Sequence, residues 1–186
     1  MMGAAEILAI SRNWGQHRTT SGDGKPIDGG RTHLARDIYI APGSWVYAPF
    51  DGTFSRWSWS NSDGSPDMGR IAYVKDDSGR TWRFIHLAVK DWAGNLKPGD
   101  RVKAGTRLGR TSTHKLGSAD SHLHLDVFPA GASTSNMDAR VDPLPILGID
   151  GFNKMIGGGG GTGLILFAAA AAGVWYWYSS KRTLRT

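Results

Sequence analysis

Two histidines stand two residues apart in the stretch 121–128, which reads SHLHLDVF. Alternate side chains of an extended chain point the same way, so the leucines and the valine of this stretch would share one buried face. His122 and His124 would then share the opposite face with Asp126. A pair of imidazoles on one face of a strand is a candidate for metal binding or proton transfer, and also for a hydrogen-bonded surface pair without chemistry.

Further imidazole and carboxylate groups occur elsewhere in the chain. His33 and Asp37 are four residues apart, where a polar segment meets a strand-like run. His86 ends an alternating run, and strand periodicity places it on the same face as Trp82 and Phe84. A catalytic zinc site takes about three nitrogen or oxygen ligands and leaves one position for water. The chain therefore holds enough donors for such a site, with spare imidazoles to move protons or stabilise an oxyanion.

Composition limits the classes of partner. The chain has 186 residues, enough for one domain with a core, and no cysteine, which excludes disulfides and thiolate ligands. Its formal net charge of +6 favours a polyanionic partner such as acidic lipid or an anionic cell wall. The basic residues are dispersed and no nucleic-acid-binding motif is visible, so we expect no nucleic-acid partner.

The elements that must position these donors are strands. The 26 glycines and the short alternating runs favour a turn-rich β domain. Residues 11–36 are polar and glycine-rich and are expected to be loops, with strand signals beginning at residue 37. The runs 70–75 and 80–87 flank DDSG and predict a β-hairpin. No amphipathic helix is expected before residue 150, so the fold class is mainly β, an antiparallel sheet or sandwich.

The C-terminal part differs in composition. Five consecutive glycines at 157–161 precede the apolar run LILFAAAAAGVWYWY at 164–178, and no charge lies between Lys154 and Lys181. A membrane-spanning helix needs about 20 predominantly apolar residues, tolerates glycine and often ends in an aromatic belt. A buried core helix or a glycine-linked segment is the alternative. We expect a folded domain over 1–148, a glycine-rich linker over 149–163, a single transmembrane helix over 164–180 and a basic tail over 181–186.

Six segments, in order and spacing, resemble those of the lysostaphin-type (LytM-like) zinc metallopeptidases, which cleave peptide bonds in bacterial peptidoglycan. HLHLDV resembles the family's H-L-H-F-E-V, and GRTHLARDIYIAP resembles its H-x-G-x-D-I-x-A-P. The resemblance covers about residues 14–128. The segments are WGQHR at 14–18, GRTHLARDIYIAP at 30–42, VYAPFDG at 46–52, FIHL at 84–87, KPGDRVKAG at 97–105 and HLHLDV at 122–127.

The resemblance implies a role for five residues. His33, Asp37 and His124 would hold one zinc ion per chain, and His86 and His122 would be catalytic histidines that orient the water and the scissile carbonyl. The implied activity is a zinc-dependent endopeptidase acting on the stem peptide or cross-bridge of peptidoglycan. His17 and His114 match no family role and are expected to be loop histidines.

Two positions depart from the family pattern. Ala35 stands where the family has glycine, and the loop GSADS at 117–121 lacks the usual pattern, but neither change removes a donor. Relatives that lost their ligands act without catalysis, so the complete donor set favours an enzyme over a non-catalytic wall-binding or structural module. A metallohydrolase acting on a protein outside the wall is a third reading.

The resemblance and the apolar segment together imply a location. Lys181, Arg182 and Arg185 would lie in the cytoplasm by the positive-inside tendency, which places the catalytic domain opposite, facing the cell wall. The start, MMGAAEILAI, does not look like a cleavable signal. A phage virion membrane, with the enzyme used at infection, and a bacterial inner membrane are both compatible with these features. The small residues 168–172 could also let such helices self-associate.

Overall fold

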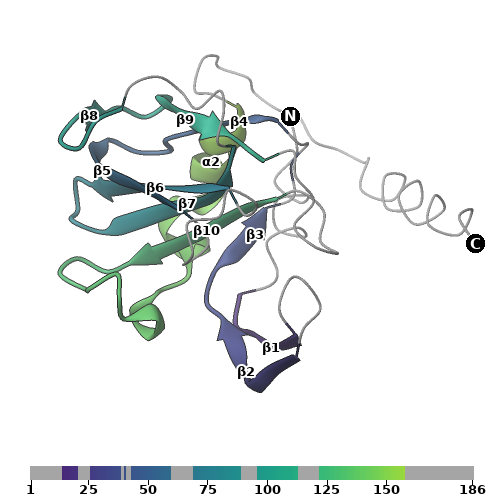
Figure 1. Cartoon of the computed structure of the whole chain (residues 1–186). Coiled ribbons are helices and arrows are strands. Elements are labelled where there is room, and N and C mark those ends of the chain that lie inside the picture. The colour runs from purple at the N-terminus through teal and green to yellow at the C-terminus, as the bar shows by residue number, and fades with distance from the viewer. Residues whose placement is uncertain are drawn as a thin grey trace, which may run out of the picture.

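The computed structural model describes residues 14–20, 26–38, 40, 43–59, 69–88, 96–112 and 122–157 (Figure 1). The expected transmembrane helix over 164–180, the basic tail and His114 lie outside these residues. Among the residues described, no helix is long and apolar enough to cross a membrane.

Six strands form one sheet in the order β3-β10-β7-β6-β5-β8 (Figure 1). Every neighbouring pair in it is antiparallel, which confirms the expected mainly β, antiparallel fold. The predicted hairpin is the β6–β7 pair. The bounds are β3 Arg36–Ile38, β5 Gly52–Trp59, β6 Arg70–Asp76, β7 Thr81–Leu87, β8 Arg101–Val102 and β10 Leu123–Phe128.

Two short antiparallel pairs accompany the sheet. Strand β4 (Trp45–Tyr47) pairs with β9 (Arg107–Arg110), and β1 (Gln16–Thr20) pairs with β2 (Pro26–His33). The β1–β2 hairpin replaces the loop expected over residues 11–36. Its strands carry little hydrophobic alternation and are held by backbone pairing, so the sequence pattern gave no sign of them.

The core covers one face of the six-stranded sheet. Strand β10 contributes Leu123, Leu125 and Val127, all fully buried, as its alternation predicts. The β4–β9 pair adds Val46 and Leu108 to the same cluster. The sheet and this pair thus enclose the apolar side chains, and the opposite face of β10 is left for its polar residues.

Helix α2 (Pro143–Gly157) completes the core. It is two helical pieces joined at Gly148, where φ is 59°, and its second piece buries Phe152 and Met155 completely. The structure therefore differs from the sequence expectation, in which a glycine-rich linker began at residue 149. The prolines of this segment and Gly148 interrupt the helical period, which hid the helix from pattern analysis.

Strand β7 contains a bulge next to His86. Arg70 of β6 pairs with Leu87, whereas Ala72 pairs with Phe84, so β7 has one extra residue across this interval. His86 has φ 67° and is the one non-glycine residue of the described part with a positive φ. Leu87 joins the core beside Phe84, and His86 lies against His122 and His124 instead. The expectation that His86 shares a face with Phe84 is wrong, because the bulge reverses the alternation.

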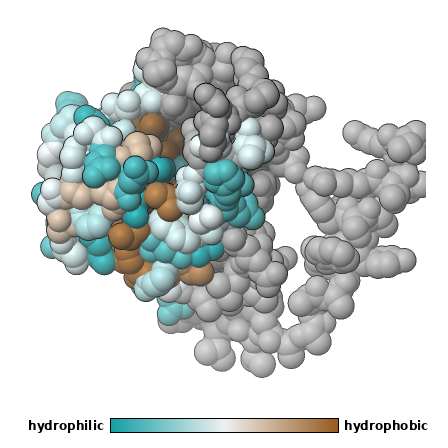
Figure 2. Space-filling view, turned by 90° about the horizontal axis from the view of Figure 1, so that it is seen from below, coloured by the Kyte–Doolittle hydropathy of each residue, from teal (hydrophilic) through white to brown (hydrophobic). Residues whose placement is uncertain are grey.

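In the coloured part of Figure 2, which shows the described residues, hydrophobic residues form small patches separated by hydrophilic ones. Among the described residues, the large hydrophobic side chain that is exposed is Met137, at 40%. Nearly all large apolar side chains of the described part are therefore shielded from solvent.

Candidate metal centre

Three strands bring the expected metal ligands together. His33 is the last residue of β2, and Asp37 is in β3 after a two-residue connection in which Ala35 is fully buried. His124 in β10 is the direct cross-strand partner of Asp37. Backbone register therefore sets the Asp37–His124 pair, and the short connection after β2 turns His33 onto them.

The three donor atoms form a compact triangle. Nδ1 of His124 lies 2.8 Å from Oδ1 of Asp37 and 3.3 Å from Nε2 of His33. The same Nε2 lies 3.3 Å from Oδ1 of Asp37. Tetrahedral zinc with bonds of about 2.0–2.1 Å separates its ligand atoms by about 3.3 Å. Two imidazoles and a carboxylate at these separations fit a zinc ion, with room for one further ligand.

The two expected catalytic histidines lie beside this triangle. Nε2 of His122 is 3.5 Å from Oδ1 of Asp37. The ring of His86 is edge-on to that of His122, with centroids 5.0 Å apart, and lies 5.8 Å from that of His124. Potential ligand atoms of His86, His122 and His124 lie within 4.8 Å of one another. All five histidine and aspartate side chains expected at the site are thus at one place, on the non-core face of the sheet.

The ionisable side chains at the site shift one another's pKa values. Burial would raise the pKa of Asp37, but hydrogen bonds with His124 and His33 outweigh it and hold that pKa far below its usual range. Burial would lower the pKa of His124, but contacts with Asp126 and Asp37 outweigh it and raise that pKa. The carboxylate of Asp37 is therefore ionised at neutral pH, as a metal ligand must be.

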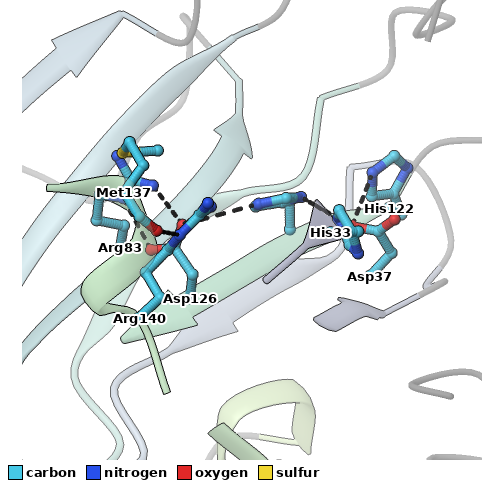
Figure 3. A network of polar contacts seen from close by, with 8 residues as sticks. His33, Asp37, Arg83, His122, Asp126, Met137 and Arg140 are labelled. Atoms are coloured by element: carbon cyan, nitrogen blue, oxygen red, sulfur yellow. Dashed lines mark hydrogen bonds and ion pairs between the residues drawn. The ribbon is translucent and has the colours of Figure 1, made fainter. Parts of the chain in front are cut away.

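A second acidic group lies behind the triangle. Figure 3 shows Asp37 with His33 and His122 at one end of a chain of contacts, and Asp126 with Arg83 and Arg140 at the other. The sequence placed Asp126 on the histidine face but gave it no role. Asp126 is the cross-strand partner of Arg83 because of the register between β10 and β7. The sequence around Asp126 does not show which residue of another strand lies opposite it.

The remaining histidines take no part in this arrangement as far as the structure describes them. His17 is exposed in β1 rather than in a loop, and it is the cross-strand partner of Thr32. His114 lies outside the described residues.

Comparison with known proteins identifies a protein family that this chain matches. The family model for Peptidase family M23 matches residues 31–137, which include all five site residues. Glycyl-glycine endopeptidase ALE-1 of Staphylococcus capitis is 33% identical over 126 residues, or 68% of this chain and 32% of that protein. Lysostaphin of Staphylococcus simulans is 34% identical over 128 residues, or 69% of this chain and 24% of that protein. The chain therefore spans about a third or less of the length of these relatives.

Two solved structures share the fold. The structure of LytU has a TM-score of 0.55 at 22% identity, over 76% of this chain and 91% of that one. The solution structure of lysostaphin has a TM-score of 0.51 at 26% identity, over 91% of this chain and 62% of that one. The antiparallel sheet described above is thus an architecture already seen in solved structures.

Proposed function

The chain belongs to peptidase family M23, and we propose that it is a zinc-dependent endopeptidase that hydrolyses peptide bonds in bacterial peptidoglycan. The observation that carries the proposal is the triangle of His33, Asp37 and His124 donor atoms, 2.8–3.3 Å apart. Zinc held there would supply a Lewis acid that polarises the scissile carbonyl and makes water a nucleophile near neutral pH.

The chain's own residues would do the rest of the chemistry. His122 and His86 stand next to the donor triangle. One imidazole takes a proton from the attacking water, and the other donates a hydrogen bond to the carbonyl oxygen as negative charge develops on it. The proton then passes to the leaving amine. The bulged backbone at His86 aims its ring at this position.

The roles of ligand and catalytic histidines can be separated by experiment. We expect His124→Ala to lose bound zinc and lysis together, because it removes one of three ligands. His122→Ala should retain zinc and lower the rate about 10²–10⁴-fold, since general acid–base groups contribute that much. Zinc content and the turbidity loss of purified sacculi are the two measurements.

His17→Ala is the matched control, because it makes the same change at an exposed histidine outside the site. Its zinc content and lysis should equal those of the unchanged chain. Undiminished lysis by a zinc-free His124→Ala protein would contradict the proposed zinc-dependent mechanism. Wall binding by the unchanged chain without release of new amine termini would identify a non-catalytic wall module instead.

The bond that is cleaved forms part of the proposal. The name of the Staphylococcus capitis relative states a glycyl-glycine endopeptidase, which makes a glycine cross-bridge the first substrate to test. The stem-peptide bond between D-alanine and diaminopimelate is the other candidate. Mass spectrometry of muropeptides released from walls of each type distinguishes them, and digestion of only non-wall proteins would contradict the substrate class.

We further propose that residues 164–180 anchor the enzyme in a membrane with its catalytic domain facing the wall. The support is sequence alone: an apolar, uncharged segment followed by Lys181 and Arg182. The membrane belongs to a phage virion or is the bacterial inner membrane. The full chain should resist alkaline carbonate extraction, a chain ending at residue 163 should not, and equal extraction of both would contradict anchoring. Detection in purified virions or in inner-membrane fractions assigns the membrane.

A further inference from the structure

Asp126 contacts the ring of His124 from the side opposite the donor triangle. It follows His124 by two residues in β10 and is completely buried. Its Oδ2 lies 3.8 Å from Nε2 of His124. The other ring nitrogen, Nδ1, is the one that faces Asp37 at 2.8 Å. The imidazole of His124 is therefore held between two carboxylates, one at each nitrogen.

Two arginines fix the orientation of Asp126. Nε of Arg83 donates a hydrogen bond to its Oδ1 at 2.8 Å, and Nη2 of Arg83 donates to its Oδ2. Nη1 of Arg140 lies 3.5 Å from the same Oδ2. The guanidinium of Arg83 also lies over the ring of Phe128, 5.0 Å from its centroid. Held in this way, the carboxylate cannot rotate away from the histidine without breaking a two-point pair.

A buried carboxylate beside an arginine does not by itself indicate a role at the site. Asp76 in β6 is also buried, and it accepts hydrogen bonds from Nε of Arg80 and Nε1 of Trp82. Those bonds close the β6–β7 turn, and Asp76 has no contact with the metal-site histidines among those described. What distinguishes Asp126 is its position at the second nitrogen of an expected metal ligand.

We propose that Asp126 is a positioning residue that keeps the ring proton of His124 on Nε2, so that Nδ1 presents its lone pair to the metal. A neutral imidazole carries its proton on one nitrogen only, and a negative group beside Nε2 favours the tautomer with the proton there. Histidines that bind metals usually donate their other N–H to such a group. Arg83 and Arg140 act through Asp126. This inference rests on the proposed metal-binding function.

The test is the zinc affinity of Asp126→Asn in the full chain, measured by competition with a chromophoric chelator. The variant keeps the size of the side chain and an acceptor oxygen but loses the charge. We expect its zinc affinity to fall about 10–100-fold, as for other changes behind metal ligands. Asp76→Asn is the matched control, because it makes the same change at another buried carboxylate that an arginine contacts, and its zinc affinity should stay unchanged.

A second measurement needs no variant. Nitrogen-15 spectra of the zinc-loaded unchanged chain should show the proton of His124 on Nε2 and none on Nδ1. A proton on Nδ1, or an Asp126→Asn protein that folds and binds zinc as tightly as the unchanged chain, overturns the inference even if that protein is active. Failure of the unchanged chain to bind zinc overturns the proposed function itself, so the two failures are distinguishable.

Discussion

At the scale of single residues, Asp126 is a buried group whose charge links the site to the stability of the fold. Burial would raise the pKa of Asp126, but the hydrogen bonds from Arg83 outweigh it, so that pKa lies below its ordinary value. In the unfolded chain an aspartate titrates near pH 3.9, at about its model-peptide value. The ionised carboxylate therefore stabilises the folded state above that pH, and this contribution is lost as the pH falls through the lower folded pKa.

The prediction at this scale concerns the metal-free protein. We expect Asp126→Asn to be less stable than the unchanged chain at pH 6, and the difference in free energy of unfolding to narrow as the pH falls below about 4. Protonation then leaves the unchanged chain with a neutral carboxyl group, which resembles the amide of the variant. Urea unfolding in the presence of a chelator, at pH values from 6 to 3, measures the difference. A gap that stays constant over this range contradicts the prediction.

At the scale of elements, the β7 bulge is what brings His86 to the metal centre. Gly69, with φ 74°, precedes β6 and allows the backbone there to approach this bulge closely. A Cβ at Gly69 would lie 2.5 Å from the carbonyl oxygen of Leu87 and 3.1 Å from the carbonyl carbon of His86. On the other side, the N–H of Ser112 donates to the carbonyl oxygen of His86 at 2.8 Å. His86 is thus held in a left-handed conformation by contacts on both sides.

Gly69→Ala should therefore displace His86. We expect the rate of hydrolysis to fall about 10–100-fold, because misplacing a catalytic group by about 1 Å has costs of this order. The zinc content should stay unchanged, since none of the expected ligands lies in β6 or β7. Hydrolysis of a short peptide substrate, zinc content and thermal unfolding are measured together.

Gly131→Ala is the matched control for this prediction. Gly131 has φ 80°, close to that of Gly69, but a Cβ there would have nothing within 4 Å. Both substitutions strain the backbone, and only Gly69→Ala also clashes with the bulge. Equal rates of hydrolysis for the two variants at equal thermal stability would contradict the prediction, because they would show that the contact between Gly69 and His86 does not affect catalysis.

The same bulge marks the limit of what the sequence could predict. Alternation identified the core face of β10 and the β6–β7 hairpin, because the residues of these strands alternate regularly outside the bulge. The side on which His86 lies could not be predicted by alternation, since one extra residue reverses the pattern and has no compositional sign. The β1–β2 hairpin and α2 were missed for related reasons: backbone pairing supports the first, and prolines and Gly148 interrupt the second. Asp126 needed the register between β7 and β10.

At the scale of the whole molecule, the folded unit extends to the end of α2. Phe152 and Met155 are fully buried in the same core as the β10 leucines, which form the back of the metal centre. Val141 also forms a bridge to Val127 of β10, which leads the chain from the sheet to this helix. The site on one face thus depends on a helix packed against the other.

This packing predicts where the chain can be shortened. A chain ending at residue 157 should fold and bind zinc, whereas one ending at residue 148 should be destabilised by about 5 kcal/mol or more. The estimate follows from losing two large buried side chains, each worth about 2–5 kcal/mol. Circular dichroism melting curves and zinc titration of the two chains are the measurements. Similar melting curves would show that the second half of α2 is dispensable.

The three donor residues come from two distant parts of the sequence, and this affects how the edge of the sheet is held in place. His33 and His124 are 91 positions apart in sequence, and β3, which carries Asp37, is an edge strand held to the sheet through β10 alone among the described strands. A metal ion shared by these residues would be a removable cross-link between the rest of the sheet and the edge strand with the hairpin before it. Removing the ion would release that edge, so a protease should first cut the metal-depleted protein ahead of β3. In surroundings rich in hydrolases, retaining the metal would then also determine how long the molecule survives.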